Sequence, residues 1–391
     1  MEGVVDRNVR QPEYFRCRER CRATVLAAIV VGLLGVQAGC GGGSSGTTGG
    51  GGIPPQVFTT IDVAEAGTSD EQGTFPLVVN LSGDVAGYYY DTNGFFHGFI
   101  RNAAGAITTV DVPATGSFDT VIDAIDSAGD TAGYYFDSQN TEHSFLRSAN
   151  GTVTTFDPPN SGSGAQSIND SGTVAGGFLD ANGAHGYLRA PGGTFTTFDP
   201  TGSGAQIEIV IPYQINASGA VTGTYTDING VRHGFLRDPS GSITILDAPG
   251  AGTAAEQGTD VLGINAGGTI AGGISIGTVN GVVGTSHSLV LATDGTYTIF
   301  DPPQSGAHSS LAEAINDSGA VVGTYRDANL VRHGYLRQPD GTFISFDDPQ
   351  AAQLPLSTTD LGTNPRDINA NGAIVGFYAD ANGVRHGFIW Q

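Results

Sequence analysis

A histidine-centred triplet recurs along this 391-residue chain at intervals of 42 to 54 residues. Its usual form is His-Gly-aromatic, with Ser replacing Gly in two copies and Leu replacing the aromatic residue in one. The seven histidines of the series are His97, His143, His185, His233, His287, His333 and His386. Recurrence at this period is typical of repeat architectures, in which each copy is one supersecondary unit packed against its neighbours.

Each copy divides into four short segments suited to β-strands, and the sixth copy shows them most clearly. Segment A ends at 314–316, segment B covers 320–326, segment C covers 331–337 and segment D covers 342–347. β-Branched and aromatic residues fill the segments, while Asp, Asn, Ser and Gly occupy the turns between them. The 61 glycines and the scarcity of helix formers favour the same all-β fold class.

The order of the segments predicts how the repeats close. Residues 58–62 form a D segment with no A, B or C segment before it, and the last copy ends at residues 386–390 without a D segment. An open solenoid would carry distinct polar caps at both ends, and none is visible. We therefore expect an all-β, seven-bladed β-propeller of four-stranded antiparallel blades over residues 57–391, with the N-terminal strand completing the last blade.

Two further positions recur in every copy. A glycine inside segment B predicts a bulge or a close backbone approach, because glycine otherwise weakens a strand. An aspartate ends segment D, where we expect it to cap the outgoing turn. The glycines are Gly87, Gly133, Gly176, Gly223, Gly272, Gly323 and Gly376, and the aspartates are Asp62, Asp111, Asp157, Asp199, Asp247, Asp301 and Asp347.

The run of motifs from Ile168 to Asp199 is the fullest copy of the repeat. It reads Ile-Asn, Gly-Thr-Val-Ala-Gly, Asp-Ala-Asn-Gly, His-Gly-Tyr-Leu and Phe-Thr-Thr-Phe-Asp in sequence. This pattern resembles the bacterial extracellular repeats named HAF after their His-Ala-Phe triplet. The resemblance covers nearly all of the chain after its first 56 residues, and it implies a secreted or surface propeller-like protein without an assigned activity.

The N-terminus predicts export. Four arginines between residues 16 and 22 precede an uncharged apolar run over 23–38, the order found in a secretory signal. The following Ala-Gly-Cys40 and a tract rich in Gly, Ser and Thr resemble a bacterial lipoprotein signal, although Gln37 replaces the usual aliphatic residue. We expect a signal peptide over 1–39, a lipidated Cys40 with a flexible linker over 40–56, and anchoring in the outer membrane or at the cell surface. An ordinary secreted protein and an uncleaved anchor are the alternatives.

The charge of the chain limits its partners. There is no lysine, and the formal net charge is −22, so nucleic acid is excluded as a partner. Cys40 would be the one cysteine left after cleavage, which excludes disulfides and thiolate metal sites in the folded part. We expect a monomer that meets the membrane through its lipid alone, with no cofactor and no metal.

The histidines themselves are expected to be structural. Segment C is the third strand from the centre of a blade, so histidines of neighbouring blades lie too far apart to share a metal ion. We expect each imidazole to form a hydrogen bond within its blade, and the aromatic ring of the triplet to pack between blades. Arginines four residues after the histidines are expected to pair with carboxylates; these are Arg101, Arg147, Arg189, Arg237 and Arg337.

The best candidate site is the place where the copies differ. The B–C turns and D–A connections vary and share one face, which we expect to be the binding surface. In the innermost strand, the residue three before the Asn or Asp of each copy also varies and should lie near the mouth of the central channel. Its polar members are the candidate ligand contacts: Asp123, Gln166, Tyr213, Glu313 and Arg366.

Two functions are open at this point. The first is a surface-tethered or secreted propeller that binds an extracellular protein, a glycan or a cation. The second is an extracellular polysaccharide lyase or hydrolase, in which Asp123 and Glu313 act as acid and base while Tyr213 or Arg366 stabilises charge. We favour binding, because one variable ring of residues is not a catalytic constellation.

Overall fold

A computed structural model describes residues 57–114, 116–159, 161–200, 207–277, 285–305, 309–352 and 362–391. These residues form 28 β-strands and no helix, so the fold is all-β as expected. None of the described residues belongs to a helix that could cross a membrane. The expected signal peptide, Cys40 and the linker lie outside the described residues.

Antiparallel pairing arranges the strands in units of four, which we label A to D from the centre outward. The A strands are β2 (Gly73–Val79), β6 (Phe118–Ile125), β10 (Gly162–Ile168), β14 (Ile207–Ile215), β18 (Gly258–Ile264), β22 (Ser310–Ile315) and β26 (Gly362–Ile368). The B strands are β3 (Val85–Tyr90), β7 (Thr131–Phe136), β11 (Val174–Asp180), β15 (Val221–Asp227), β19 (Ile270–Ile276), β23 (Val321–Arg326) and β27 (Ile374–Ala379).

The outer two strands of each unit complete the set. The C strands are β4 (Phe96–Arg101), β8 (Glu142–Arg147), β12 (Gly183–Arg189), β16 (Arg232–Arg237), β20 (Thr285–Leu291), β24 (Arg332–Arg337) and β28 (Arg385–Trp390). The D strands are β5 (Ile107–Val110), β9 (Val153–Phe156), β13 (Phe195–Phe198), β17 (Ile243–Leu246), β21 (Tyr297–Phe300), β25 (Phe343–Phe346) and β1 (Phe58–Ile61). Strand β1 pairs with β28, so the D strand of the last unit comes from the N-terminal part of the chain.

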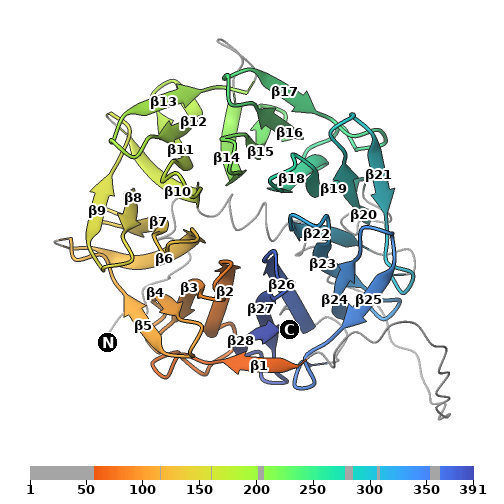
Figure 1. Cartoon of the computed structure of the whole chain (residues 1–391), viewed down its shortest axis with the longest axis horizontal. Coiled ribbons are helices and arrows are strands. Elements are labelled where there is room, and N and C mark those ends of the chain that lie inside the picture. Colours follow the sequence, from red (N-terminus) through yellow and green to blue (C-terminus); the bar gives the residue numbers. More distant parts are fainter. Residues whose placement is uncertain are drawn as a thin grey trace, which may run out of the picture.

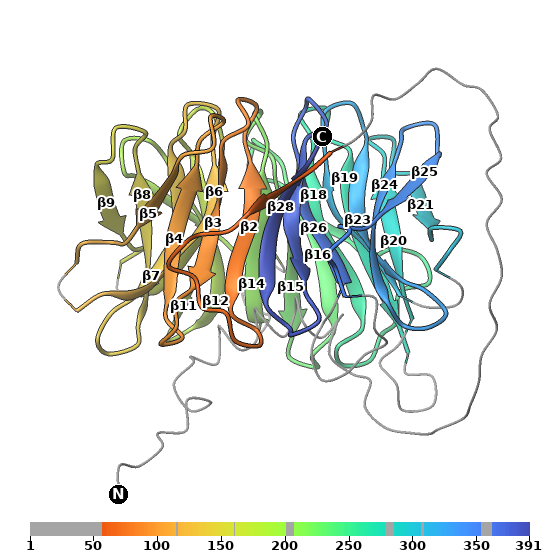
Figure 2. The ribbon, with the colours of Figure 1, turned by 90° about the horizontal axis from the view of Figure 1, so that it is seen from below.

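The units stand side by side around a central axis, with the A strands facing the axis (Figure 1). Seen from the side, the strands run roughly along that axis and the turns gather at the two ends (Figure 2). Single parallel bridges join some neighbouring units into sheets of twelve and eight strands, while two units remain separate four-stranded sheets. This is the arrangement of a β-propeller.

Every A strand contains a β-bulge opposite the recurring glycine of strand B. In the first unit Pro76 pairs with Gly87 and Val78 with Ala86, so the residue between them has no partner. A Cβ atom on Gly87 would lie 2.1 Å from the Phe75 carbonyl oxygen. This distance is too short for any residue with a side chain. The glycine therefore marks both a bulge and a close backbone approach, as the sequence predicted.

Asparagine side chains link six of the units to the next at the A–B turns. Asn316 Nδ2 donates to the Asn369 carbonyl oxygen at 3.1 Å, and Asn369 Nδ2 donates to the Asn80 carbonyl oxygen of the first unit at 2.9 Å. Asn80, Asn169, Asn216 and Asn265 make the same bond to their neighbours. Asp126 holds the equivalent position in the second unit, and an ionised carboxylate has no hydrogen to donate.

The histidine triplets connect strands C and D by hydrogen bonds and pack against the preceding unit. Each histidine Nδ1 lies 2.5 to 3.0 Å from the aspartate that follows strand D. The third residue of each triplet is fully buried, and Phe235 packs against Phe198 of the preceding unit with ring centroids 5.9 Å apart. The aspartate was expected to cap the outgoing turn, but its carboxylate instead binds the imidazole of the same unit.

The arginines four residues after the histidines do not pair with carboxylates in the described part of the chain. Arg189, Arg237 and Arg337 instead place their guanidinium groups 4.5 to 5.4 Å from the centroids of phenylalanine rings on the preceding D strand. Stacking of this kind stabilises a partly buried cation without a counter-ion. The expectation of ion pairs was therefore wrong.

Hydroxyl groups replace apolar contacts at two junctions. Tyr187 OH lies 2.9 Å from Ser144 Oγ, Ser144 Oγ lies 2.7 Å from Ser163 Oγ, and Ser163 donates to Asp157. The second copy of this buried chain consists of Tyr335, Ser288, Ser310 and Asp301. Serine stands in the triplet only in the unit that precedes a tyrosine triplet, so each hydroxyl finds its partner across the junction.

The incomplete asparagine link predicts a stabilising substitution. Asp126→Asn supplies the missing donor to the Asn169 carbonyl, and its Oδ1 can keep the bonds to the Ala128 and Asp130 N–H groups. Burial raises the pKa of the Asp126 carboxyl, so the substitution also removes an unfavourable charge. We expect a gain of about 1 kcal/mol in the free energy of unfolding, measured by chemical denaturation.

The reverse change is the matched control. Asn316→Asp places a carboxylate at a complete junction and should lower the free energy of unfolding by a similar amount or more. An Asp126→Asn variant no more stable than the parent protein would contradict the role given to these links.

Candidate functional site

The bulges select one side chain from each innermost strand. The residue that the bulge leaves without a ladder partner is the variable residue three positions before the Asn or Asp of its unit. In the fourth unit the bulge spans Pro212 and Tyr213 opposite Gly223. The bulged residues are Leu77, Asp123, Gln166, Tyr213, Leu262, Glu313 and Arg366. A bulge re-aims a side chain that regular pleating would place elsewhere.

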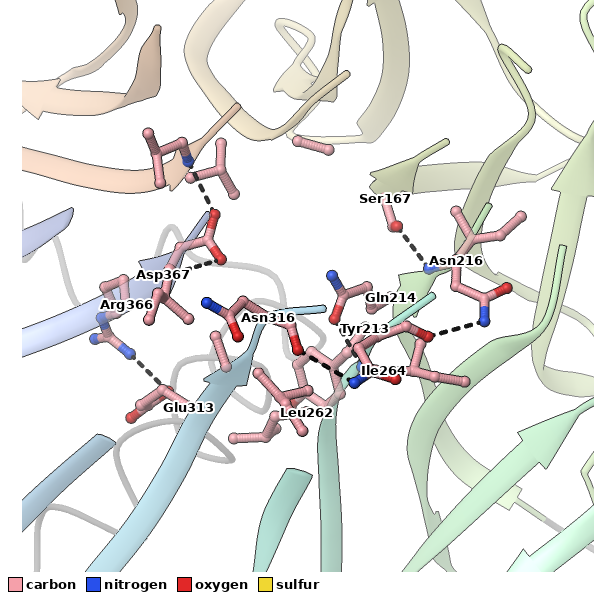
Figure 3. Close-up of a pocket in the computed structure, with 18 of the residues that line it drawn as sticks. Ser167, Tyr213, Gln214, Asn216, Leu262, Ile264, Glu313, Asn316, Arg366 and Asp367 are labelled. Atoms are coloured by element: carbon pink, nitrogen blue, oxygen red, sulfur yellow. Dashed lines mark hydrogen bonds and ion pairs between the residues drawn. The ribbon is translucent and has the colours of Figure 1, made fainter. Parts of the chain in front are cut away.

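All seven bulged residues line one cavity of about 350 Å³ on the central axis. Figure 3 shows four of them in its wall, namely Tyr213, Leu262, Glu313 and Arg366. The cavity wall continues through the ends of the A strands to A–B turn residues such as Ala217, Asp317 and Ala370. The structure thus brings together all five polar residues proposed from the sequence. The cavity lies at the A–B-turn end of the channel, whereas the variable B–C turns and D–A connections lie at the other end.

An ion pair forms one part of the cavity wall. Arg366 Nη1 lies 3.5 Å from Glu313 Oε2, and both side chains are largely buried. The Arg366 guanidinium also lies 5.2 Å from the centroid of the Phe377 ring. These contacts hold both charged groups in place at the junction of the last two units, and Figure 3 shows the ion pair.

The remaining bulged residues give the wall a mixed character. Asp123 and Gln166 are buried, and the Gln166 Oε1 atom accepts a hydrogen bond from the Gly177 N–H at 2.9 Å. Tyr213 is half-buried and contributes an aromatic face, while Leu77 and Leu262 contribute apolar surface. A mixture of a few fixed polar groups with apolar surface is typical of small-molecule sites.

Three aspartates in the cavity wall were missed in the sequence, namely Asp260, Asp317 and Asp367. Asp260 lies 3.3 Å from Arg232 Nη1, and both are buried. Burial raises the pKa of Asp260; the Arg232 guanidinium opposes this shift and the Glu313 carboxylate adds to it. Asp260 lies two residues before its bulge, so a comparison of the bulge position alone could not find it.

Asp367 follows the bulged Arg366 directly and bridges the last unit to the first. Its Oδ2 accepts the Val79 N–H at 2.9 Å and its Oδ1 accepts the Ile368 N–H at 2.8 Å. Burial raises the pKa of Asp367 to about 6 against the effect of these two bonds. Uncharged Ser167 and Gln214 accept the corresponding N–H groups in other units, so a negative charge is not needed for this bond.

The cavity wall is rich in carboxylates. Among the described residues that line it, the acidic ones are Asp123, Asp260, Glu313, Asp317 and Asp367, and the one basic residue is Arg366. The described residues contain no group of three or more His, Cys, Asp or Glu arranged to hold a metal ion. The excess of carboxylates over guanidinium groups disfavours an anionic ligand.

Comparisons with known proteins identify the fold. No family model and no curated protein sequence matches the chain. Among solved structures, a streptogramin B lyase gives a TM-score of 0.52 at 15% identity over 85% of this chain and 97% of its own. The β-propeller domain of the Trilobed protease from Pyrococcus furiosus gives 0.51 at 11% identity over 81% of this chain and 95% of its own.

A virginiamycin B lyase from Staphylococcus aureus, whose structure contains quinupristin, is also similar. Its TM-score is 0.51 at 14% identity, over 86% of this chain and 99% of that one. The TM-scores indicate a shared β-propeller architecture. At identities this low, they say nothing about a shared activity.

The raised pKa of Asp367 predicts a pH effect on stability. Because the folded state holds this proton more tightly than the unfolded chain, its ionisation lowers stability as the pH rises from about 4 to 6. Asp367→Asn keeps an acceptor for the Val79 N–H and removes the ionisation. Relative to the parent protein, the variant should gain on the order of 1–2 kcal/mol in unfolding free energy between pH 4 and pH 7.

Urea unfolding across this pH range measures the difference. Asp317→Asn is the control, since it also removes one carboxylate from the cavity wall but leaves Asp367 in place. Parallel stability curves for the parent protein and Asp367→Asn would show that Asp367 does not titrate in this window.

Proposed function

We propose that this protein is an exported, lipid-anchored binding propeller that holds a small neutral or cationic polar ligand in its central cavity. The observation that carries the proposal is the coincidence of the bulge with the non-repeating residue in every unit. The packing of the repeat does not dictate these residues, yet each is turned toward the same cavity. Bulges are enriched next to functional sites for this reason.

The properties of the cavity support this class of ligand. A volume of about 350 Å³ lies within the range of small-molecule pockets, and the Arg366–Glu313 pair offers fixed donors and acceptors. The surplus of carboxylates favours an uncharged sugar end, an amine or a cation over an acidic polysaccharide. A protein loop or a glycan chain could present such a group, while the variable B–C and D–A face remains available for a larger partner.

The architecture that we propose is a closed ring of seven blades, with β1 as the outer strand of the last blade. Four residue pairs between Phe58–Ile61 and the 387–390 segment support this closure. The hydrogen bond from Asn369 Nδ2 to the Asn80 carbonyl also connects the last unit to the first.

The cellular location rests on the sequence. A signal peptide over 1–39, lipidation of Cys40 and a linker over 40–56 would tether the propeller to a membrane surface. A tether of this kind suits a binding protein, because it keeps the cavity near the membrane without embedding the domain. The HAF-like repeats agree with an extracellular setting, and a secreted form is the alternative.

An extracellular lyase or hydrolase is the second candidate. Asp123 and Glu313 line the same cavity, which an acid and base pair would require. Against this, Glu313 is already engaged by Arg366. The binding function is the simpler account of a cavity in which one of the two proposed catalytic carboxylates is already paired.

A ligand screen tests the site directly. Residues 57–391 would be screened against neutral sugars, amino sugars, polyamines and divalent cations by calorimetry or glycan array. We expect Asp123→Ala and Glu313→Ala each to weaken binding at least tenfold, since each removes a polar group from the wall. Asp294→Asn, in an exposed turn outside the cavity, is the control and should leave affinity unchanged.

The same variants separate the two functions. Binding that survives both alanine substitutions would contradict the cavity as the site. Turnover of a polysaccharide that either substitution abolishes would replace binding with catalysis as the function.

Ring closure predicts that β1 is essential to the domain. Deletion of residues 57–63 removes the outer strand of the last blade, together with the buried side chains of Ile61 and Val63. We expect the thermal midpoint to fall sharply, and Ile61→Ala alone to cost about 2–4 kcal/mol, measured by thermal and chemical unfolding. Deletion of residues 50–56 is the matched control; equal midpoints for both deletions would refute the closure.

A further inference from the structure

Each histidine of the repeat lies close to two carboxylates wherever the B–C turn is described. His143 shows the arrangement well: Nδ1 is 2.7 Å from Asp157 Oδ2, and Nε2 is 3.4 Å from Asp137 Oδ2. His185 lies 2.5 Å from Asp199 and 3.1 Å from Asp180. His97, His233, His333 and His386 face Asp91, Asp227, Asp327 and Asp380 through Nε2 at 3.7 to 3.9 Å.

Only a protonated imidazole can bond to both carboxylates. A neutral imidazole has one N–H donor and one nitrogen acceptor, whereas the imidazolium has two donors. Ionised carboxylates only accept hydrogen bonds. A neutral His143 that donates to Asp157 therefore turns the lone pair of Nε2 toward Asp137, which repels it.

The two carboxylates belong to the two connections at one end of the propeller. Asp137 begins the B–C turn, and its Oδ1 accepts the N–H groups of Gln139 and Thr141. Asp157 directly follows the D strand β9 and begins the connection to the next unit. A charged His143 thus bridges the starting points of both connections, while Tyr135 stacks on its ring at 5.3 Å.

The groups around the other imidazoles repeat this environment. Phe178, Tyr325 and Tyr378 of the B strands lie against His185, His333 and His386. The charged groups that face these rings are Asp180 and Asp199 for His185, Asp327 and Asp347 for His333, and Asp62, Asp380 and Asp348 for His386.

The balance of these effects favours the charged ring. Burial opposes the charge of His143, but its bonds to Asp157 and Asp137 outweigh burial and raise its pKa. The pKa values of His185 and His333 are raised in the same way. The hydrogen bond to Asp62 is the main cause of the raised pKa of His386.

We propose that the Asp–His–Asp groups of His143, His185, His333 and His386 form a pH-dependent clamp that fastens their B–C turns to the ends of the D strands below neutral pH and releases them above it. This inference is independent of any ligand in the central cavity. The sign follows from linkage: a raised pKa in the folded state gives stability that is present below about pH 6.5 and is lost as the pH rises through the folded-state value. The variable end of the propeller is therefore stiffer in mildly acidic surroundings.

Hydrogen exchange of the B–C turn amides tests the clamp. Gln139 and Thr141 report on the second unit, because their N–H groups bond to Asp137. After correction for the intrinsic pH dependence of exchange, we expect their protection to fall about fivefold between pH 5.5 and pH 8.5, as loss of one hydrogen bond predicts.

Two variants isolate the imidazole. Asn at position 137 can accept the turn N–H groups through Oδ1 and donate from Nδ2 to the Nε2 of a neutral ring, so Asp137→Asn should keep protection high at both pH values. His143→Gln cannot be protonated and should show low protection at both. The B–C turn after Asp380 is the internal reference in each variant and should keep its pH response.

Two outcomes would overturn the clamp. The first is equal corrected protection of Gln139 and Thr141 at pH 5.5 and pH 8.5 in the parent protein. The second is a pH response of the same size in Asp137→Asn, since that variant removes the repulsion between the neutral ring and the turn carboxylate.

Discussion

The contact between a strand-B glycine and the carbonyl oxygen of strand A sets the geometry of every unit. A Cβ atom at these glycines would lie 2.0 to 2.4 Å from that oxygen, so no other residue fits. The close approach permits the bulge, and the bulge frees one residue of the innermost strand from ladder pairing. The scaffold can therefore stay constant while one inward position per unit varies.

Contacts between units are made by different chemistry at different radii. Near the axis, asparagine amides bond to the next backbone; further out, the third residue of each triplet packs against the preceding D strand; and arginines stack on phenylalanine rings beside it. None of these recurring contacts needs an ion pair, and ion pairs between described residues of neighbouring units are limited to Arg366–Glu313 and Arg232–Asp260. The carboxylates instead accept hydrogen bonds from turn N–H groups, bind imidazoles or line the cavity.

The sequence predicted the strands, their order, the glycine bulge and the five polar bulged residues that line the cavity, because each follows from period and alignment. It did not predict that Asp157 bonds to His143, since residues 14 apart meet only through the register of two strands. Asp260, Asp317 and Asp367 were missed because the copies were compared at the bulge position alone, without the residues around it. Predicting that the cavity lies at the A–B-turn end would have required the path of each strand in space, which the spacing of the repeats alone does not give.

The two buried hydroxyl chains also bear on how such a protein changes over evolutionary time. Ser144 is satisfied by Tyr187 of the following unit, and Ser288 by Tyr335. A repeat carrying one member alone would bury a hydroxyl without a partner, at a cost of about 1–3 kcal/mol. Duplication or recombination of repeats is therefore constrained to move such neighbours together, so the heritable module at these junctions is a pair of adjoining half-units rather than a single blade.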